Sequence, residues 1–566
     1  MLPQSPDLNG RPRYRRGLLA VALGIAAFVC WCGYFIYPYL GGPLFSANDL
    51  LNHVRLVENA REALAGGQIL LRFSNSGGLM LQPVFLYYTP VLYSVAGGIE
   101  WGFGISAYDA LLIAVGLFTG IAFVGTWRLL RLLGCENLVA GVGSCAYITA
   151  PYFLTDIFAR GAMTEVAFFC LLPVVFHATL SQAQGEGMGS FLYFVGALAL
   201  ILITHKIFAA WLLILLVGVH FGVAGVNPRK NVIFGLGVAA ALAVSAPYWF
   251  NAWLNVGNLA FAGHSPVGYI KMIGRFHHVA LDGEPSVMGI RWSVLTADFS
   301  IFYLLPYTSP LSTTPNLHLQ IGSMVSVALV LSLLYSREDR WLWMPAALTI
   351  MGILVVCSFW YLFPFWRYLP GFLQVIQFPY RLLGFVALAG CVLAALLAED
   401  LARRARYIPL ALLIFGLVFQ WFAFRERPLL TQVNSSAVES TDRTDIFFWE
   451  PNAAPAPPSP VLVPKFRSMT MLASNRLRFI LAEPLAHDAL VKFPVVPSQY
   501  LRVFAGGRQS RLFQDERNLV VACRKGEKAF FVERIDPVGF GLSFLLGAGL
   551  AAAAYFVSRS AARSAP

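Results

Sequence analysis

The sequence predicts a polytopic α-helical membrane protein of about 12 transmembrane helices with a small extracytoplasmic β domain near its C-terminal end. First, 58% of the 566 residues are hydrophobic and only 12% are charged, whereas soluble domains carry about 25% charged residues. Second, the apolar residues gather in runs long enough to cross a bilayer. Third, short alternating stretches, typical of β-strands, lie between the last two apolar runs.

Twelve apolar stretches are the predicted spans. The first is longer than the core of a signal peptide, so we expect it to remain as an uncleaved anchor. The twelve spans cover about 17–39, 105–127, 136–152, 162–181, 190–204, 207–225, 231–250, 321–336, 341–361, 381–398, 407–423 and 537–557.

The basic residues give the orientation. Short clusters of arginine and lysine alternate with the spans, as the positive-inside rule expects for cytoplasmic loops, and this placement excludes nucleic acid as the partner behind the net charge of +12. With the N-terminus inside, the cytoplasmic side receives Arg11, Arg13, Arg15, Arg16, Arg128, Arg131, Arg229, Lys230, Arg337, Arg340, Arg403, Arg404, Arg406, Arg559 and Arg563.

The same topology predicts a bacterial cytoplasmic (inner) membrane protein with both termini in the cytoplasm. Outer loops are expected at about 40–104 and 251–320, and a shorter outer segment at 363–381. We expect a transmembrane domain over 1–424, a β domain over 425–536, and a last span with a cytoplasmic tail over 537–566.

The predicted β domain contains the proline-rich connector PNAAPAPPSP, which is incompatible with a helix interior. After it come RLRFILAE, ALVKFPVV and AFFVERID, separated by turn signals such as AGG and KGE. This alternation predicts a small all-β domain tethered to the last span.

The stretch Asp49–Leu64 predicts an amphipathic helix that lies along the membrane interface, because its apolar residues recur at helical spacing. Asp49 and His53 are four residues apart and therefore share a face of that helix. Two interpretations of Asp49 stay open. It is either an N-cap, which carboxylates fill well, or a catalytic carboxylate at the membrane surface.

Further ionisable residues fall on the same predicted side of the membrane. Asp156, Arg160 and Glu165 lie between two spans, and His205 with Lys206 lies in the next short turn on that side. Charges at membrane depth are costly and mark function or topology. The alternatives are a structural ion pair between Arg160 and Glu165, and a turn histidine satisfied by its surroundings.

The segment LPGFLQVIQFPYR brings Gln377, Tyr380 and Arg381 to the outer end of a span. The planar guanidinium of an arginine matches phosphate oxygens, although an arginine at a helix end can also be a snorkelling anchor. A separate group of tyrosines and a tryptophan is predicted to be interfacial-belt aromatics without a special role. These are Tyr87, Tyr88, Tyr93 and Trp101.

A metal site is possible but not supported by the sequence, so no cofactor is predicted. His277, His278, Asp282 and Glu284 are ligand-type residues in the 251–320 loop, but adjacent histidines rarely reach one ion and no zinc-binding helix motif is present. The phosphate-binding, nucleophile-elbow and dinucleotide motifs of soluble enzymes are also absent from the sequence.

Several motifs together resemble the GT-C superfamily of membrane glycosyltransferases. More narrowly, the chain resembles the bacterial membrane proteins labelled "6-pyruvoyl-tetrahydropterin synthase-related", although no pterin chemistry follows from that name. The motifs are NDLLNHVRLVENAREALAGGQI, LQPVFLYYTPVLY, ARGAMTEVAFFCLLPVVF, VIQFPYRLLGF, VKFPVVPSQYLRVFAGG and CRKGEKAFFVE.

The resemblance implies a transferase of hexosyl or pentosyl groups. Asp49 matches the first-loop acid that acts as general base in that superfamily, and the donors there are polyprenyl-phosphate sugars. Asp49 is followed by Leu-Leu-Asn-His rather than by a second acid, which favours a metal-independent site. The acceptor is expected to be an extracytoplasmic glycan or lipid.

Roles for the other candidate residues follow from the chemistry of such a transfer. We expect His53 to orient or assist Asp49. Donor or phosphate binding is assigned to Arg160, Glu165, His205, Lys206, Gln377, Tyr380 and Arg381, with Glu165 positioning Arg160.

Two other functions remain open at this point. A transporter or flippase for lipid-linked cargo would share the spans and the outer cations, but it would place ionisable residues near mid-span. A non-enzymatic envelope assembly protein would use the β domain for partners. Replacing Asp49 by asparagine, itself a good cap, would then have no effect.

Overall fold

The structure is a computed structural model of the chain. It describes residues 12–560, apart from 256–320, 335–343, 360–372, 374–378, 424–453 and short gaps of one to three residues. The predicted outer loop at 251–320, with its histidines and acids, therefore lies almost entirely outside the described residues, and so does most of the segment 363–381.

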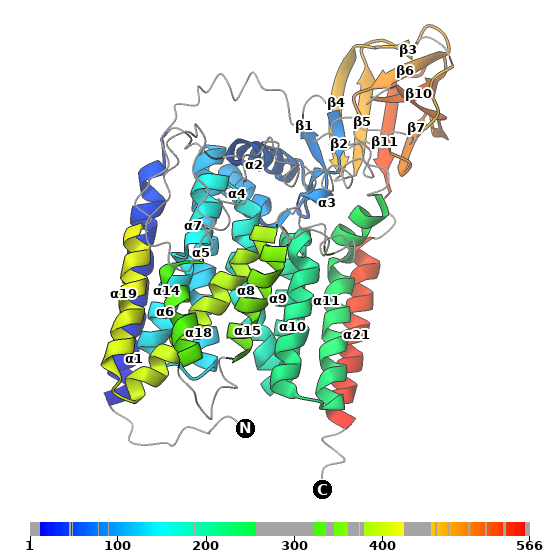
Figure 1. The fold of residues 1–566 in the computed structure, drawn as a ribbon. Coiled ribbons are helices and arrows are strands. Elements are labelled where there is room, and N and C mark those ends of the chain that lie inside the picture. Colours follow the sequence, from blue (N-terminus) through cyan, green and yellow to red (C-terminus); the bar gives the residue numbers. More distant parts are fainter. Residues whose placement is uncertain are drawn as a thin grey trace.

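A bundle of helices forms the body of the molecule (Figure 1). Each of the twelve predicted spans overlaps one of its helices. They are α1 (Pro12–Phe35), α5 (Ala107–Leu132), α6 (Asn137–Ile148), α8 (Met163–Gln184), α9 (Met188–Thr204), α10 (Ala209–Ala224), α11 (Pro228–Asn255), α14 (Ser323–Leu334), α15 (Met344–Phe359), α18 (Leu383–Arg403), α19 (Tyr407–Ala423) and α21 (Phe540–Ser560).

Among the described residues, seven helical segments are long and apolar enough to cross a membrane, so the predicted count of twelve is not confirmed. Helix α6 reaches that length because it continues through α7 (Pro151–Thr155) as far as Phe158. Helices α9 and α14 fall short of the length, with 17 and 12 residues.

Helix α8 lies at the centre of the bundle, with 89% of its most apolar window buried. The neighbouring α18 approaches it closely at Gly384, where an added Cβ would lie 2.1 Å from the ring of Phe169. Small residues of this kind let helices pack where lipid supplies no hydrophobic driving force. By contrast, α10 and α21 bury only 22% and 17% of their windows and present apolar side chains outward, as lipid-facing helices do.

The first of the predicted outer loops folds over one end of the bundle. Helix α2 (Leu50–Ala65) confirms the helix predicted from Asp49 to Leu64 and lies across the bundle end, while α4 (Pro90–Phe103) packs against it (Figure 1). Between them come a two-stranded hairpin, β1 (Ser74–Ser76) and β2 (Leu79–Gln82), and the short helix α3 (Val84–Tyr87).

The C-terminal region before α21 is a β region of two sheets. The predicted strand segments are confirmed as β5 (Arg476–Leu481), β6 (Ala489–Phe493) and β11 (Ala529–Arg534). One sheet has the order β3-β6-β10-β9 and the other β4-β5-β11-β7-β8. The strands are β3 (Val461–Leu462), β4 (Phe466–Ala473), β5 (Arg476–Leu481), β6 (Ala489–Phe493), β7 (Leu501–Ala505), β8 (Arg508–Gln509), β9 (Leu512–Asp515), β10 (Asn518–Cys523) and β11 (Ala529–Arg534).

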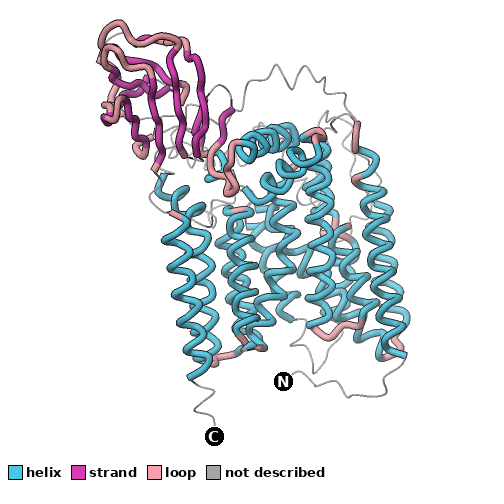
Figure 2. Tube along the Cα trace, turned by 180° about the vertical axis from the view of Figure 1, so that it is seen from behind, coloured by secondary structure: helices cyan, strands magenta, loops and turns pink. Residues whose placement is uncertain are grey.

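The β region rests on the hairpin end of the first outer loop (Figure 2). Phe73, Leu81 and Leu86 share a buried core with residues of both sheets. The buried Arg534 of β11 lies over the Phe73 ring, with its Cζ 5.2 Å from the ring centroid. The β region and α2 therefore stand at the same end of the bundle, opposite the first residues of α1 and the last residues of α21.

Candidate active site

Asp49 occupies the N-cap position of α2, but its side chain makes no capping hydrogen bond. Its backbone N–H instead donates to the carbonyl oxygen of Arg160 at 2.8 Å. The backbone thus ties the start of α2 to the turn before α8. The carboxylate therefore does not make the capping hydrogen bond that its interpretation as an N-cap requires.

Charged groups close to Asp49 influence its ionisation. The residue is exposed on the protein surface, yet partial removal from water by the surrounding protein raises the pKa of its carboxyl above the ordinary value of 3.8. The Arg160 and Arg381 guanidinium groups oppose this rise in pKa, whereas the Glu165 carboxylate adds to it.

Arg160 ends a single π-helical turn, η2 (Asp156–Arg160), followed by Gly161 in the left-handed region at φ +67°. Its guanidinium donates to both oxygens of Glu165, at 2.6 and 2.9 Å, and also to Asp156 and to the Tyr152 hydroxyl. The side chains of Arg160 and Glu165 are nearly inaccessible, with residue exposures of 4% and 3%. The ion pair between them, which was one of the open interpretations, is therefore present in the structure.

Arg381 joins this group from the turn η6 (Pro379–Leu382) at the start of α18. Its Nε lies 3.2 Å from Glu165 Oε1, so one carboxylate bridges two guanidinium groups. We call Asp156, Arg160, Glu165 and Arg381 the arginine–carboxylate cluster. It lies at the ends of three candidate membrane-crossing segments, Asn137–Phe158, Met163–Gln184 and Leu383–Arg403.

His53 lies on the inner side of α2, where its Nδ1 is 2.7 Å from the hydroxyl of Tyr93 in α4. Burial lowers the pKa of His53 to about 4, so the ring is neutral at pH 7. The interpretation of Tyr93 as an interfacial-belt aromatic is wrong. The residue is 0% exposed because α4 packs its tyrosine face against α2, whereas Trp101 is 62% exposed.

His205 is buried where α9 ends, and its ring contacts Phe168 and Phe208. Burial lowers the pKa of His205 to about 3, against the opposing influence of Glu165. Its Nδ1 has no hydrogen-bond partner among the described residues, so the expectation of a satisfied turn histidine does not hold there. Lys206 donates from Nζ to the Leu86 carbonyl oxygen of α3, which ties it to the hairpin end of the loop.

The structure thus gathers most of the predicted site residues at one end of the bundle. Asp49, His53 and His205 lie close enough to the arginine–carboxylate cluster to interact electrostatically with it. Gln377 lies outside the described residues, and Tyr380 is described only by its backbone in η6.

Sequence reasoning missed two tyrosines of the site. Tyr152 precedes Asp156 by four residues and Arg160 by eight, a spacing that places all three on one helix face and could have signalled the contact. Tyr93 carried no comparable signal, because its burial depends on how α4 packs on α2.

The described residues contain no group of three histidine, cysteine, aspartate or glutamate side chains arranged to hold a metal ion. His277, His278, Asp282 and Glu284 lie outside those residues. What the site offers chemically is a surface carboxylate within electrostatic range of two arginines, and two buried neutral histidines that interact with the same cluster.

No protein-family model matches the chain, and no curated protein matches it either, so the narrower family named above gains no support. The chain is similar to an oligosaccharyltransferase from Archaeoglobus fulgidus, solved in the apo form, with 12% sequence identity and a TM-score of 0.38. The match covers 74% of this chain and 56% of the archaeal chain. It is also similar to arabinofuranosyltransferase AftD from Mycobacteria, with 16% sequence identity and a TM-score of 0.43. That match covers 73% of this chain and 27% of the AftD chain.

ArnT from Cupriavidus metallidurans, bound to undecaprenyl phosphate, is 12% identical over 89% of this chain and 97% of its own, with a TM-score of 0.26. This chain spans about half of the archaeal protein and about a quarter of AftD. Likeness at these TM-scores carries no weight for function, which has to be argued from the chain's own site.

Proposed function

We propose that this protein is a membrane glycosyltransferase of the GT-C type. It moves a sugar from a polyprenyl-phosphate donor to a glycan or lipid acceptor on the outer side of a bacterial cytoplasmic membrane. The observation that carries the proposal is the placement of Asp49. Its carboxylate stands at the start of helix α2, makes no capping bond, and lies within electrostatic range of the Arg160 and Arg381 guanidinium groups.

In the proposed reaction, Asp49 takes the proton from an acceptor hydroxyl as that oxygen attacks the anomeric carbon of the donor sugar. A new C–O bond forms, the bond between the anomeric carbon and the phosphate oxygen breaks, and polyprenyl phosphate leaves with the electron pair. A base positioned for this step contributes typically 10²–10⁴-fold in rate.

The leaving phosphate needs positive charge at the membrane surface. Arg381 is the residue that we assign to it first, because its side chain is more exposed than that of Arg160, at 11% against 5%. Arg160 then acts mainly by fixing Glu165, which in turn orients Arg381 at 3.2 Å. Lys206 and His205 are assigned to the donor on the side of α3, with His53 supporting Asp49.

The experiment uses the purified protein in proteoliposomes with a panel of radiolabelled polyprenyl-phosphate hexoses and pentoses. It follows two quantities, the release of free polyprenyl phosphate and the movement of intact donor between leaflets. Cleavage of at least one donor, with the label transferred to an outer glycan or lipid, is the expected result. Intact donor that crosses the bilayer without cleavage would overturn the proposal in favour of a flippase.

A further inference from the structure

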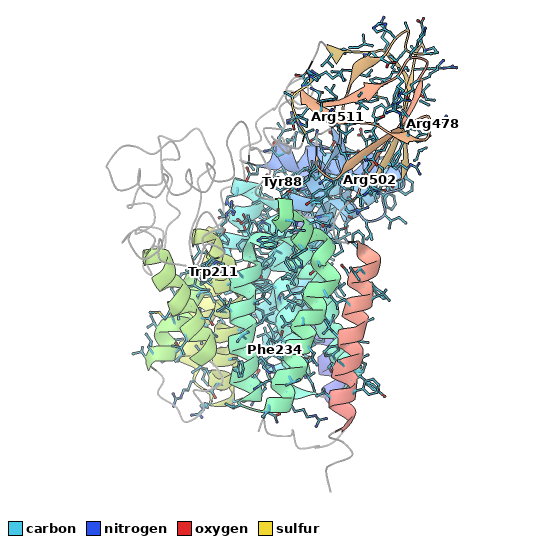
Figure 3. All side chains as sticks on the ribbon, turned by 90° about the vertical axis from the view of Figure 1, so that its right-hand side faces the viewer. Tyr88, Trp211, Phe234, Arg478, Arg502 and Arg511 are labelled. Atoms are coloured by element: carbon cyan, nitrogen blue, oxygen red, sulfur yellow. The ribbon has the colours of Figure 1, made fainter. Side chains whose placement is uncertain are left out.

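The second sheet of the β region exposes an unusually cationic face. Along β5 the buried and outward positions alternate, and Arg476 and Arg478 point outward. On β7 the exposed outward residue is Arg502, whereas Leu501 and Val503 are buried. Figure 3 labels Arg478 and Arg502 on the β region. We call Arg476, Arg478 and Arg502, together with Phe504, Phe531 and Glu533 between them, the arginine face.

The strand register sets these side chains in two rows across β5, β11 and β7. In one row Arg478 is opposite Phe531, and Phe531 is opposite Phe504. In the other row Glu533 lies between Arg476 and Arg502. The Cα atoms of Arg476 and Arg502 are thus roughly 10 Å apart, which is two interstrand spacings.

Phe531 holds two of the guanidinium groups. The Cζ atoms of Arg476 and Arg478 lie 5.2 and 5.8 Å from the centroid of its ring. Stacking of this kind limits the motion of a long side chain and leaves the fork of N–H donors available at its edge. Phe504, half-buried beside Phe531, adds a second apolar ring to the row.

The charge of the arginine face is unbalanced. Glu533 is its single carboxylate against three arginines. Within the part of the chain that the structure describes, the ion pairs of the β region are Lys492–Asp515 and Arg508–Glu527, and neither involves this face. An exposed surface with two rings and excess guanidinium charge complements a partner that carries both apolar faces and anionic groups.

We propose that the arginine face binds an acidic glycan, a sugar polymer that bears carboxylate or phosphate groups. Guanidinium forks bind such groups through paired hydrogen bonds, and the Phe504 ring offers a surface for the apolar side of a pyranose. Strands β5 and β11 run roughly along the long axis of the bundle (Figure 1). The face therefore looks sideways rather than down onto a bilayer, which favours a glycan over an anionic lipid surface.

We further infer that this glycan is the acceptor of the transferred sugar, and only that part of the inference rests on the proposed function. Binding itself is measured without a donor and without turnover. A loss of glycan binding and a loss of glycosyl transfer are therefore separate results, and each can occur without the other.

The test uses the full chain in nanodiscs of phosphatidylcholine, with polygalacturonate as the carboxylate probe, phosphomannan as the phosphate probe and dextran as the neutral control. The variants are Arg476→Gln, Arg478→Gln and Arg502→Gln, alone and combined. Arg511→Gln is the matched control, because Arg511 is exposed and its Cζ lies 5.2 Å from the centroid of the Phe513 ring, but it directly precedes β9 of the other sheet.

We expect salt-sensitive binding of at least one acidic polymer, no binding of dextran, and a loss of about tenfold or more in affinity in the triple variant. Which probe binds identifies the anionic group. Binding of neither polymer, or equal binding by the triple variant and Arg511→Gln, would overturn the inference. Preference for phosphatidylglycerol vesicles over both polymers would do so as well, and would assign the face to the membrane.

Discussion

At the scale of single residues, Glu165 is the centre of the site, because its one carboxylate holds two guanidinium groups in a buried position. Breaking a buried ion pair by removing one partner leaves an uncompensated charge and costs about 3–5 kcal/mol. We expect Glu165→Gln to lower the free energy of unfolding by an amount of this order. The variant should also lose glycosyl transfer activity.

Thermal unfolding of the variant in detergent measures this loss. Asp400→Asn is the control, since the Asp400–Arg404 pair is partly exposed, with side-chain exposures of 21% and 42%, and such pairs contribute roughly 0–1 kcal/mol. Equal stability of the two variants would mean that the arginine–carboxylate cluster does not hold the site together.

The lowered pKa values of the two buried histidines determine how their contribution to the free energy of unfolding depends on pH. The pKa values of His53 and His205 are lowered to about 4 and about 3 in the folded chain, whereas the ordinary value is 6.5. In the unfolded chain both rings bind protons below pH 6.5, while in the folded chain they stay neutral, so their contribution to stability falls as the pH falls from 6.5.

We therefore expect these two rings to lower the unfolding temperature between pH 7 and pH 5. The decrease should be smaller in His53→Gln, which removes one of the two titrating rings. A differential scanning experiment at matched ionic strength measures both curves. The same pH dependence of the unfolding temperature in the native chain and in His53→Gln would contradict the assigned protonation states.

At the scale of elements, the contact between α2 and the π-helical turn η2 positions Asp49. Gly161 makes this contact possible, because it adopts φ +67° and an added Cβ would lie 2.7 Å from the backbone nitrogen of Leu50. We expect Gly161→Ala to displace the start of α2 and to cost more than about 1 kcal/mol of stability, since both the backbone angle and the space oppose a side chain.

The matched control is Gly67→Ala, just after α2. Gly67 also has a positive φ, of +86°, but nothing lies within 4 Å of its added Cβ. Both variants carry the strain of the backbone angle, and only Gly161→Ala adds the clash. Hydrogen exchange at the first turn of α2 should rise in Gly161→Ala alone, and equal exchange in both variants would contradict the positioning role of this contact.

Some elements of the site were predictable from the sequence, and others were not. Helix α2 was predictable because its apolar residues recur at helical spacing, and strands such as β5 were predictable because buried and exposed residues alternate. The π-helical turn that carries Asp156 and Arg160 was not, since its shape depends on the contacts with Glu165 and α2 rather than on local propensity.

The contact between Arg381 and Glu165 joins two helices far apart in the chain. The sequence could place both residues on one side of the membrane from the alternation of basic loops. It could not bring them within 3.2 Å, because that distance depends on how α18 packs beside α8. The buried Tyr93–His53 hydrogen bond was missed for the same reason.

At the scale of the whole molecule, the site, α2 and the β region share one end of the bundle, and the basic loops predict that this end faces outward. We expect a fluorescent protein fused after α21 to fluoresce inside cells, because the basic loops predict that this end is cytoplasmic. Alkaline phosphatase at the same point should be inactive, while an insertion at the exposed turn Gly506–Gly507 of the β region should be accessible from outside.

Alkaline phosphatase that is active at the C-terminal end would reverse this orientation and place Asp49 on the cytoplasmic side. A lipid-linked donor would then have to be used inside, and the proposed outer acceptor would be wrong. The fusion experiment thus tests the topology without relying on any assumption about the reaction.

The proposed reaction depends above all on Asp49 as the base, and Asp49→Asn removes that base. Asparagine keeps the capping ability of the residue but removes the base, and Glu62→Gln, an exposed carboxylate on the same helix, is the control. With a donor that the native protein cleaves, we expect the release of polyprenyl phosphate to fall at least about 100-fold in Asp49→Asn, at unchanged protein amount and unfolding temperature, and to stay normal in Glu62→Gln. Native rates in a stable Asp49→Asn protein would contradict the claim and show that the base lies elsewhere.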